Sequence, residues 1–287
     1  MTLYKNFEID SQNEVLTGYE WNISDPKAVC CLIHGIGEHA GRYDHVGKSF
    51  NDAGIALVSM DLRGHGRSPG KRGHIGDRII VRKDIDNLIE YIKRKYPGIP
   101  LILYGHSLGG NISLEYRLRG EHSAEMTGYL ITSPWIKLVR QIPSILQHVI
   151  EVGDKMIPTA VISQKIDNKM LGNMDHIKKE EDSDLRHQNI SIHTALEGFS
   201  VAEEIMNNSI LDKYGGGEKP VLLMHGTDDP VCDIEGSRAV AGIYGEICEF
   251  IEWEDYLHEL HNGTDDKPGE PVIEKMIDWV LKTANSN

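Results

Sequence analysis

The residues best suited to covalent chemistry surround Ser107, in the run Gly105-His106-Ser107-Leu108-Gly109. This run has the pattern G-x-S-x-G and lies between an apolar stretch, 101–103, and a helix-compatible stretch that begins near residue 108. A strand, a sharp turn that carries a serine and a helix make up a nucleophile elbow. Glycine tolerates the close approach of helix and strand at such a turn. Ser107 is therefore a candidate nucleophile for acyl transfer.

A five-residue pattern is also typical of an ordinary glycine-rich turn with a capping serine. A serine hydroxyl is a weak nucleophile at neutral pH, so it needs an adjacent base, and that base needs a partner that fixes its tautomer. In hydrolases with this elbow the order along the chain is serine, then aspartate or glutamate, then histidine. The chemical interpretation therefore depends on an acid and a histidine that follow later strands.

Two adjacent aspartates follow one of these late strands. Val221 to Met224 is an apolar run of strand length, and Gly226 begins a turn that leads to Asp228 and Asp229. We favour Asp229 as the acid because it is third after the glycine and directly precedes a proline, with Asp228 as the alternative. Either carboxylate could instead cap the next helix, although Asp233 suits that position better.

The histidine is expected after the last strand, which the run from Glu249 to Trp253 predicts. His258 is the first histidine beyond that strand, and His261 follows three residues later. A single histidine among the fourteen in this chain would ordinarily be a solvated surface residue. Its third place in the order serine, acid, histidine leads us to favour His258 over His261.

The negative oxygen of a tetrahedral intermediate needs preorganised donors, each worth roughly 3 kcal/mol. One candidate is the backbone N–H of Leu108, directly after the nucleophile. The other is the backbone N–H of Ile36, in the loop Gly35-Ile36-Gly37 that follows an apolar run at 28–33. The glycines on both sides of Ile36 allow the backbone to approach a substrate closely.

The elements that position these residues alternate between strands and helices. An edge hairpin is predicted from alternating apolar and polar residues at 2–9 and 14–21. Buried strands are predicted at 28–33, 55–60, 101–103, 126–131, 221–224 and 248–253. Helices are predicted at 41–53, 79–95, 108–119, 233–244 and 272–282. This alternation predicts an α/β fold, with a mostly parallel central sheet covered by helices on both faces.

The alternation is interrupted between residues 135 and 194, where no strand signal is found. Apolar residues at helical spacing predict an amphipathic helix there, over 142–150, and 178–184 is a charged, solvated run. We expect residues 135–194 to form a helical cap inserted into a core of residues 1–134 and 195–287. The apolar stripe is expected to pack the cap onto the core, and part of it to line an apolar substrate pocket.

Charge and composition exclude several kinds of partner. The chain has 287 residues and a formal net charge of -14, which argues against nucleic-acid binding and against electrostatic attachment to anionic lipid. No HExxH, Walker A or dinucleotide motif is present, so we expect no metal and no cofactor. No apolar run approaches the roughly 20 residues of a membrane span.

The cysteines favour a cytoplasmic protein. The four cysteines form no CxxC pair, and neighbouring cysteines rarely bridge, so we expect reduced thiols. The first ten residues carry charges and lack a long apolar core, so no signal peptide is expected. Cys232 follows Asp229 by three residues, and we expect it to have a packing role close to the site.

Several motifs together resemble the α/β-hydrolases of the monoacylglycerol lipase and lysophospholipase type, within the serine aminopeptidase S33-like hydrolases. The resemblance extends over nearly the whole chain. The motifs that carry it are His34-Gly35-Ile36-Gly37-Glu38-His39 with Arg42-Tyr43, Gly64-His65-Gly66-Arg67-Ser68, Gly105-His106-Ser107-Leu108-Gly109-Gly110, Gly226-Thr227-Asp228-Asp229 and Leu257-His258-Glu259-Leu260. The family's triad and oxyanion positions fall on Ser107, Asp229, His258, Ile36 and Leu108.

The resemblance also implies a substrate. It implies the α/β-hydrolase fold with a helical, lipid-facing cap, and polar contacts from Glu38 and Arg42 near the glycerol end. We expect a carboxylic ester hydrolase that acts through an acyl-enzyme on monoacylglycerol or a similar lipid ester, with transient membrane contact through the cap. The alternatives are a lysophospholipase or a short-chain or aryl carboxylesterase, then a peptidase or a non-catalytic binding protein. An aspartate-dependent dehalogenase or epoxide hydrolase is disfavoured because Ser107 occupies the elbow.

Overall fold

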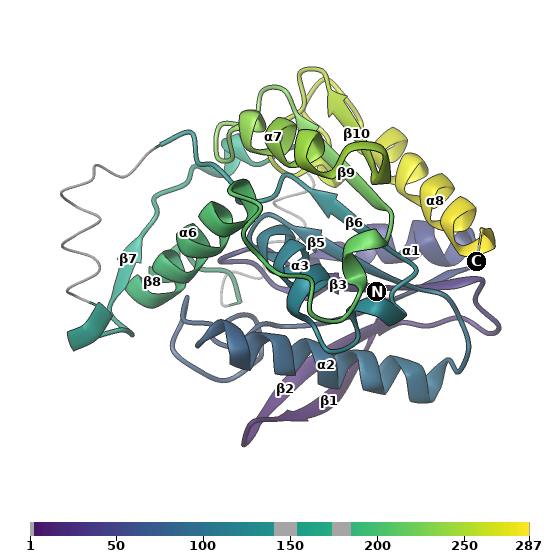
Figure 1. Cartoon of the computed structure of the whole chain (residues 1–287), viewed down its shortest axis with the longest axis horizontal. Coiled ribbons are helices and arrows are strands. Elements are labelled where there is room, and N and C mark those ends of the chain that lie inside the picture. The colour runs from purple at the N-terminus through teal and green to yellow at the C-terminus, as the bar shows by residue number, and fades with distance from the viewer. Residues whose placement is uncertain (1–2, 141–153, 174–184, 287) are drawn as a thin grey trace.

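The computed structural model describes residues 3–140, 154–173 and 185–286. Eight strands form one sheet in the order β1-β2-β4-β3-β5-β6-β9-β10 (Figure 1). These strands are β1 (Lys5–Ser11), β2 (Glu14–Trp21), β3 (Ala28–Ile33), β4 (Ile55–Met60), β5 (Leu101–His106), β6 (Gly128–Thr132), β9 (Val221–Gly226) and β10 (Cys248–Trp253). The β1–β2 hairpin is antiparallel and lies at one edge, and the strands from β4 to β10 are parallel. The predicted α/β architecture is confirmed.

Helices cover both faces of this sheet (Figure 1). Buried side chains of α1 and α8 belong to the core on one face, and those of α2, α3, α6 and α7 to the core on the other. The helices are α1 (Asp44–Asp52), α2 (Arg78–Lys95), α3 (Leu108–Arg119), α6 (Ile192–Met206), α7 (Ile234–Tyr244) and α8 (Glu270–Asn285). Short 3-10 helices are η1 (Ala40–Tyr43), η2 (Ser123–Glu125), η3 (Asn168–Met170), η4 (Gly216–Glu218), η5 (Gly245–Ile247) and η6 (Leu260–Asn262).

The central strands are apolar throughout because each contributes to both cores. In β3, Val29, Cys31 and Ile33 face one core, and Ala28, Cys30 and Leu32 face the other. Successive side chains of a strand point to opposite faces, so a strand covered on both sides has no polar positions to alternate with. The parallel direction also brings the carboxyl ends of β3, β5, β9 and β10 to one edge of the sheet. The loops that carry the predicted site residues all leave from that edge.

The region from 135 to 194 contains strands, and the expectation that it has none was wrong. β7 (Val161–Ser163) pairs with β8 (Asn189–Ser191) in a separate antiparallel ribbon. Each strand has three residues, too few to produce a recognisable alternation, and the partners are far apart in the sequence. The apolar stripe at 142–150 and the charged run at 178–184 both lie outside the described residues. Helix α6 begins at Ile192 and therefore crosses the boundary expected at 194.

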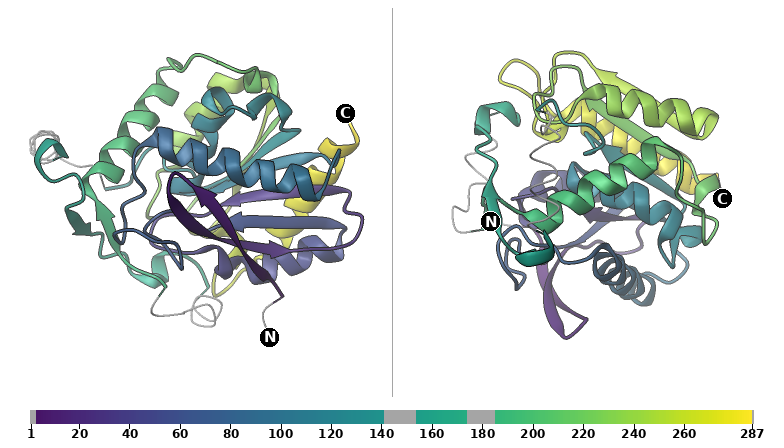
Figure 2. Two further views of the ribbon diagram at one scale, coloured as in Figure 1. Left: turned by 90° about the horizontal axis from the view of Figure 1, so that it is seen from below. Right: turned by 60° about the vertical axis from the view of Figure 1, so that its left-hand side comes forward.

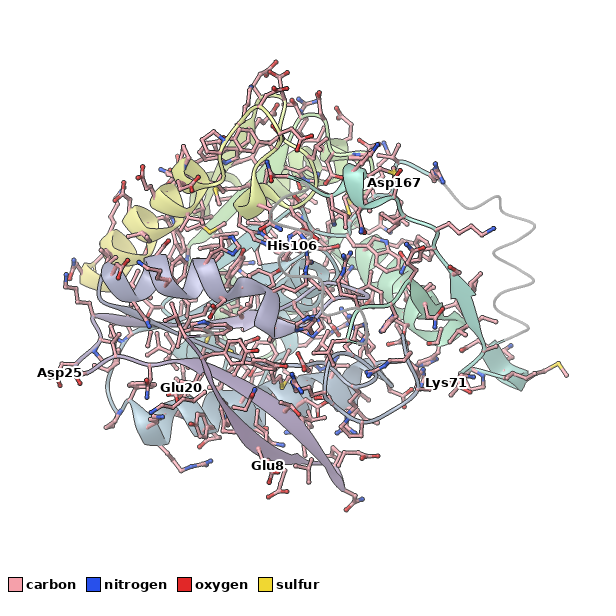
Figure 3. The ribbon with its side chains drawn as sticks, turned by 180° about the vertical axis from the view of Figure 1, so that it is seen from behind. Glu8, Glu20, Asp25, Lys71, His106 and Asp167 are labelled. Atoms are coloured by element: carbon pink, nitrogen blue, oxygen red, sulfur yellow. The ribbon has the colours of Figure 1, made fainter. Side chains whose placement is uncertain are left out.

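The β7–β8 ribbon lies beside the main body, next to α6 (Figure 2). Figure 3 shows His106, the buried last residue of β5, near the centre of the view, whereas Asp167 lies nearer the side of the molecule that carries the ribbon. Helix α6 packs on α3 and α7, and so connects the ribbon to the elbow helix. Within the described ranges, no helix combines the length and apolar character that crossing a bilayer requires.

Candidate active site

Ser107 lies at the junction of β5 and α3 in a strained backbone conformation. Its φ of 55° and ψ of -117° are unfavourable for a residue with a side chain. Three backbone hydrogen bonds hold it there: its N–H donates to the Thr132 carbonyl at 3.0 Å, and its carbonyl accepts from Trp135 at 3.0 Å and Asn111 at 3.1 Å. The strain directs the hydroxyl away from the strand and into the loops at the edge of the sheet.

The two glycines of the motif are required by close packing. A Cβ at position 109 would lie 1.9 Å from the Ile33 carbonyl oxygen, and one at position 105 would lie 2.4 Å from the carbonyl oxygen of Gly109. Both contacts are with backbone atoms, which cannot turn aside. Any side chain at either position would therefore push α3 away from the sheet and displace Ser107.

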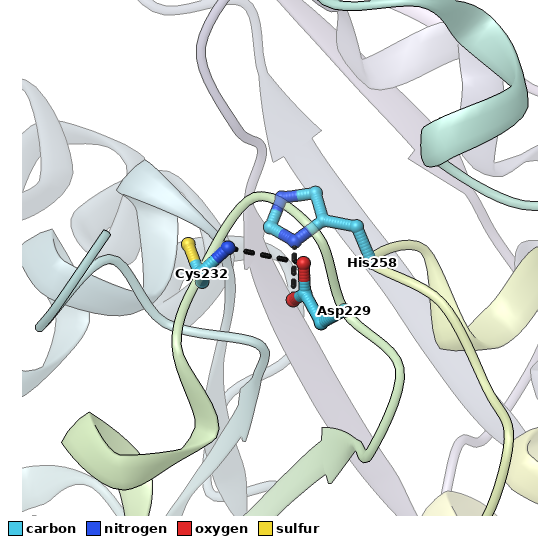
Figure 4. Close-up of side chains that lie close together, drawn as sticks. All are labelled: Asp229, Cys232 and His258. Atoms are coloured by element: carbon cyan, nitrogen blue, oxygen red, sulfur yellow. Dashed lines mark hydrogen bonds and ion pairs between the residues drawn. The ribbon is translucent and has the colours of Figure 1, made fainter. Parts of the chain in front are cut away.

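Ser107, His258 and Asp229 are connected by two hydrogen bonds. The Ser107 Oγ lies 2.9 Å from His258 Nε2. His258 Nδ1 lies 2.7 Å from Asp229 Oδ2, and Figure 4 shows this second bond. A carboxylate can only accept, so Nδ1 carries the proton and Nε2 is free to accept from the serine hydroxyl. The three side chains come from the loops after β5, β9 and β10, and all are buried.

The alternative acid and base, Asp228 and His261, lie outside this line of hydrogen bonds. Asp228 is exposed, and its carboxylate is paired with the Thr227 hydroxyl at 3.3 Å. His261 is buried, but its ring stacks on Tyr43 at 4.7 Å between centroids. Of the two adjacent aspartates and the two nearby histidines, only Asp229 and His258 are hydrogen-bonded to each other.

The surroundings of His258 and Asp229 shift the pKa values of both residues. Burial alone would lower the pKa of His258, but the charge of Asp229 and its hydrogen bond outweigh burial and raise that pKa above 6.5. Burial alone would raise the pKa of Asp229, but His258 and a hydrogen bond from His225 outweigh it and hold the pKa well below 3.8. The carboxylate is therefore ionised and stabilises an imidazolium that forms on His258.

His225 and Cys232 hold the carboxylate of Asp229 in place, and no local sequence pattern indicates this role for His225. Its Nε2 lies 3.1 Å from Asp229 Oδ2, while the backbone N–H groups of Val231 and Cys232 donate to Oδ1 at 2.8 and 3.0 Å. The Cys232 thiol is buried close by, since potential ligand atoms of Asp229, Cys232 and His258 lie within 4.8 Å of one another (Figure 4). Because both carboxylate oxygens already accept hydrogen bonds, this cluster is explained without a metal.

The predicted oxyanion residues, Leu108 and Ile36, both lie near Ser107. Leu108 is the first residue of α3, so its N–H has no partner within the helix. Ile36 lies in the β3 loop and lines the same cavity as Ser107 and His258. The preceding N–H, of Gly35, donates to Glu38 Oε1 at 2.5 Å, which fixes the start of this loop.

Glu38 and Arg42, expected near a substrate's alcohol end, belong to a buried ion cluster with Glu259. Arg42 donates to Glu38 Oε2 at 2.7 Å and to both oxygens of Glu259 at 2.8 Å. Glu259 directly follows His258, so the cluster joins the loop that contains Ile36, here called the oxyanion loop, to the loop that contains His258. No local sequence pattern around Glu259 indicates this role.

Two adjoining cavities lie at the candidate site, and Ser107 lines the smaller one. A small polar one of about 60 Å³ is lined by Ser107, His258, Glu38 and Arg42, among others. A larger one of about 250 Å³ has a mostly apolar lining that includes Trp135, Ile162 and Phe199. The two share Gln164, Ile166 and Val231 as lining residues, so they adjoin each other.

The parallel sheet, the elbow after β5 and the loops at its carboxyl edge define an α/β-hydrolase. The chain belongs to the family described as serine aminopeptidase, S33, whose model matches residues 24–265.

The chain is similar to proteins from several organisms. It is 28% identical over 263 residues to the monoacylglycerol lipase of Mycolicibacterium smegmatis, covering 90% of this chain and 89% of that protein. It is also 28% identical over 279 residues to an uncharacterized abhydrolase domain-containing protein of Dictyostelium discoideum, covering 95% of this chain but 28% of the relative's length. The crystal structure of Paleococcus ferrophilus monoacylglycerol lipase matches with a TM-score of 0.80 and 28% identity, covering 93% of this chain and 99% of that one.

Proposed function

We propose that the protein is a serine hydrolase that cleaves carboxylic esters through an acyl-enzyme. The observation that carries this proposal is the continuous hydrogen-bonded line from Ser107 Oγ through His258 to Asp229, at 2.9 and 2.7 Å. Ser107 attacks the ester carbonyl while His258 Nε2 takes its proton, and Asp229 stabilises the imidazolium. His258 then gives the proton to the departing alcohol, and water repeats the sequence to release the acid.

The backbone N–H groups of Ile36 and Leu108 are proposed to hold the oxyanion of each tetrahedral intermediate. The N-terminus of α3 adds the positive end of a helix dipole beneath this charge. Glu38 and Arg42 are proposed to act at the alcohol end, through the polar cavity that they line with Ser107. Because both terminal nitrogens of Arg42 donate to Glu38 or Glu259, we propose that Arg42 acts mainly by holding the loops that contain these two residues together.

The preferred substrate class is proposed to be monoacylglycerol. A long apolar acyl chain suits the larger cavity, and a small polar alcohol suits the smaller one, in which Ser107 would meet the ester carbonyl. Relatives from M. smegmatis and P. ferrophilus that carry the name monoacylglycerol lipase support the same class.

The insertion, residues 135–194, is proposed to be the cap that forms the acyl site. Trp135, Ile162 and Met170 of its described part line the apolar cavity. Met156 and Ile157 are 77% and 59% exposed, which supports transient contact of the cap with a lipid surface. The four cysteines are free thiols, which supports the proposal of a cytoplasmic location.

A substrate panel tests this function. Glycerol monoesters and p-nitrophenyl esters from acetyl to palmitoyl would be compared with lysophospholipids of matched acyl chains and with amino-acid amides. We expect kcat/KM to be highest for medium- or long-chain monoacylglycerol. A preference for acetyl esters, lysophospholipids or amides would contradict the assigned substrate class, and turnover of none of them would contradict the reaction.

A further inference from the structure

Residues 185–191, here called the return segment, are the part of the insertion that leads into α6, and they run along two loops of the core. The backbone N–H of His187 donates to the Gly37 carbonyl at 2.9 Å. Four residues later, the N–H of Ser191 donates to the Gly73 carbonyl at 2.9 Å. The first of these bonds reaches the loop that contains Ile36.

The contact between the return segment and the oxyanion loop is a close backbone-to-backbone contact. Gly37 has a φ of 77°, and a Cβ there would lie 2.2 Å from the carbonyl oxygen of His187. No side chain separates the two backbones, so a displacement of residue 187 is transmitted directly to the peptide groups on either side of Gly37.

The imidazole of His187 anchors the return segment at this point. Its Nδ1 accepts from the Asn189 N–H at 3.3 Å, so the proton lies on Nε2, which donates to the Gly64 carbonyl at 3.0 Å. Burial lowers the pKa of His187, which favours this neutral form. The same side chain also lines the polar cavity that contains Ser107.

Three contacts therefore determine how the Ile36 N–H is directed. On one side, Gly35 is held by its N–H bond to Glu38 and by its carbonyl, which accepts from His34 Nδ1 at 2.7 Å. On the other side, the Gly37 carbonyl is held by His187. The contacts to Gly35 come from the oxyanion loop's own neighbourhood, whereas the contact to Gly37 comes from the insertion.

We propose that His187 is a positioning residue for the oxyanion hole: through its bond to Gly64 it fixes the return segment, which in turn fixes the Ile36 N–H. The inference rests on the proposed function, because it assigns Ile36 the role of an oxyanion donor. His187 touches no reacting atom in this role. Through His187, the geometry of the oxyanion hole depends on how the return segment packs against the core.

The test is to replace His187 with leucine and with glutamine. Glutamine places an amide N–H near the position of Nε2 and can still donate to Gly64, whereas leucine cannot. Removing one oxyanion donor outright costs 10²–10³ in kcat, so misdirecting it in His187→Leu should lower kcat by about 10-fold, with KM changed by less than about 3-fold. His187→Gln should restore kcat to within about 3-fold of the parent.

A transition-state analogue separates positioning from general damage. An alkyl trifluoromethyl ketone accepts Ser107 Oγ at its carbonyl carbon, the serine proton passes to His258, and the ketone oxygen becomes an oxyanion. Its Ki should rise about 10-fold in His187→Leu, in parallel with the loss of kcat. Fluorophosphonate titration corrects every rate for the fraction of competent enzyme.

His74→Leu is the matched control, since it removes a histidine that contacts the return segment at the Ser191 hydroxyl, 2.9 Å away, and does not touch Gly37. Its kcat and Ki should stay within about 3-fold of the parent. An unchanged Ki in His187→Leu, or an equal rise in His74→Leu, would overturn the inference while the parent still hydrolyses esters. If the leucine variant does not fold, His187→Asn, too short to reach Gly64, replaces it. An inactive parent would instead contradict the proposed function.

Discussion

Replacing Arg42 with methionine should leave two buried carboxylates without their shared cation. The guanidinium side chain is 0% exposed, and those of Glu38 and Glu259 are 6% and 4% exposed. Methionine fills similar apolar volume, so the change removes the charge and its hydrogen bonds more than the packing. The structure therefore predicts a large loss of stability that arises mainly from electrostatics.

The magnitude follows from the contacts that are lost. Arg42 makes three charge-assisted hydrogen bonds of 2.7–2.8 Å, two of them as a bidentate pair with Glu259. Breaking a buried pair by removing one partner costs about 3–5 kcal/mol, because the remaining charge stays buried without compensation. We expect the free energy of unfolding of Arg42→Met to fall by about that amount at pH 8.

The loss should depend on pH in a defined direction. In the parent, burial would raise the pKa of Glu259, but Arg42 outweighs burial and holds that pKa below 4.5. The stability that ionised Glu259 contributes is therefore lost only as the pH falls below the pKa of this carboxyl group in the unfolded chain. In the variant, burial without the cation raises the carboxyl pKa above its unfolded value. Stability is then lost as the pH rises through that raised pKa, by about 1.4 kcal/mol per pH unit for one proton. The deficit should be larger at pH 8 than at pH 5.

Urea unfolding at pH 5 and pH 8 measures this deficit. Arg42→Met with Glu259→Gln removes one of the stranded charges and should recover part of the stability at pH 8. A deficit below about 1 kcal/mol, or one that is equal at both pH values and not relieved by Glu259→Gln, would refute the reasoning.

Two further predictions concern the candidate triad. Asp229→Asn should lower kcat by about 10⁴-fold because His258 loses the partner that fixes its tautomer. Asp228→Asn, at an exposed position, should change kcat by less than about 3-fold. Steady-state ester hydrolysis by the two variants measures the difference, and a larger loss at Asp228 would reverse the assignment. Since His258 must be neutral to accept the serine proton and Asp229 raises its pKa, kcat/KM should increase with pH through an ionisation above 6.5. A pH profile of kcat/KM from 5 to 9 measures that ionisation, and an acid limb centred well below 6.5 would contradict the argument.

The central part of the site could be predicted because each residue lies in the loop or turn that follows a strand. Ser107, Asp229 and His258 come after β5, β9 and β10, and parallel strands bring their carboxyl ends to the same edge. Chain order and strand recognition were therefore sufficient to predict that these three residues would lie together. The oxyanion loop could be placed for the same reason, since it follows β3.

Residues that act through long-range contacts could not be found in this way. Arg42 and Glu259 are separated by 217 positions, and nothing in either local pattern indicates a bidentate pair. His225 looks like a strand residue and gives no sign that it reaches Asp229. The β7–β8 ribbon was missed because three-residue strands carry too little alternation, and because their pairing depends on how the insertion returns to the core.

The most direct test of the account is to react the parent and Ser107→Ala with a long-chain alkyl fluorophosphonate and measure intact mass together with monoacylglycerol hydrolysis. The parent should gain one phosphonyl group, located at Ser107 by peptide mapping, and should lose its hydrolytic activity in proportion to labelling. Ser107→Ala should fold with the same thermal stability, take up no label and hydrolyse no ester above background. Labelling at another residue, or ester turnover by Ser107→Ala close to that of the parent, would contradict the assignment of Ser107 as the nucleophile.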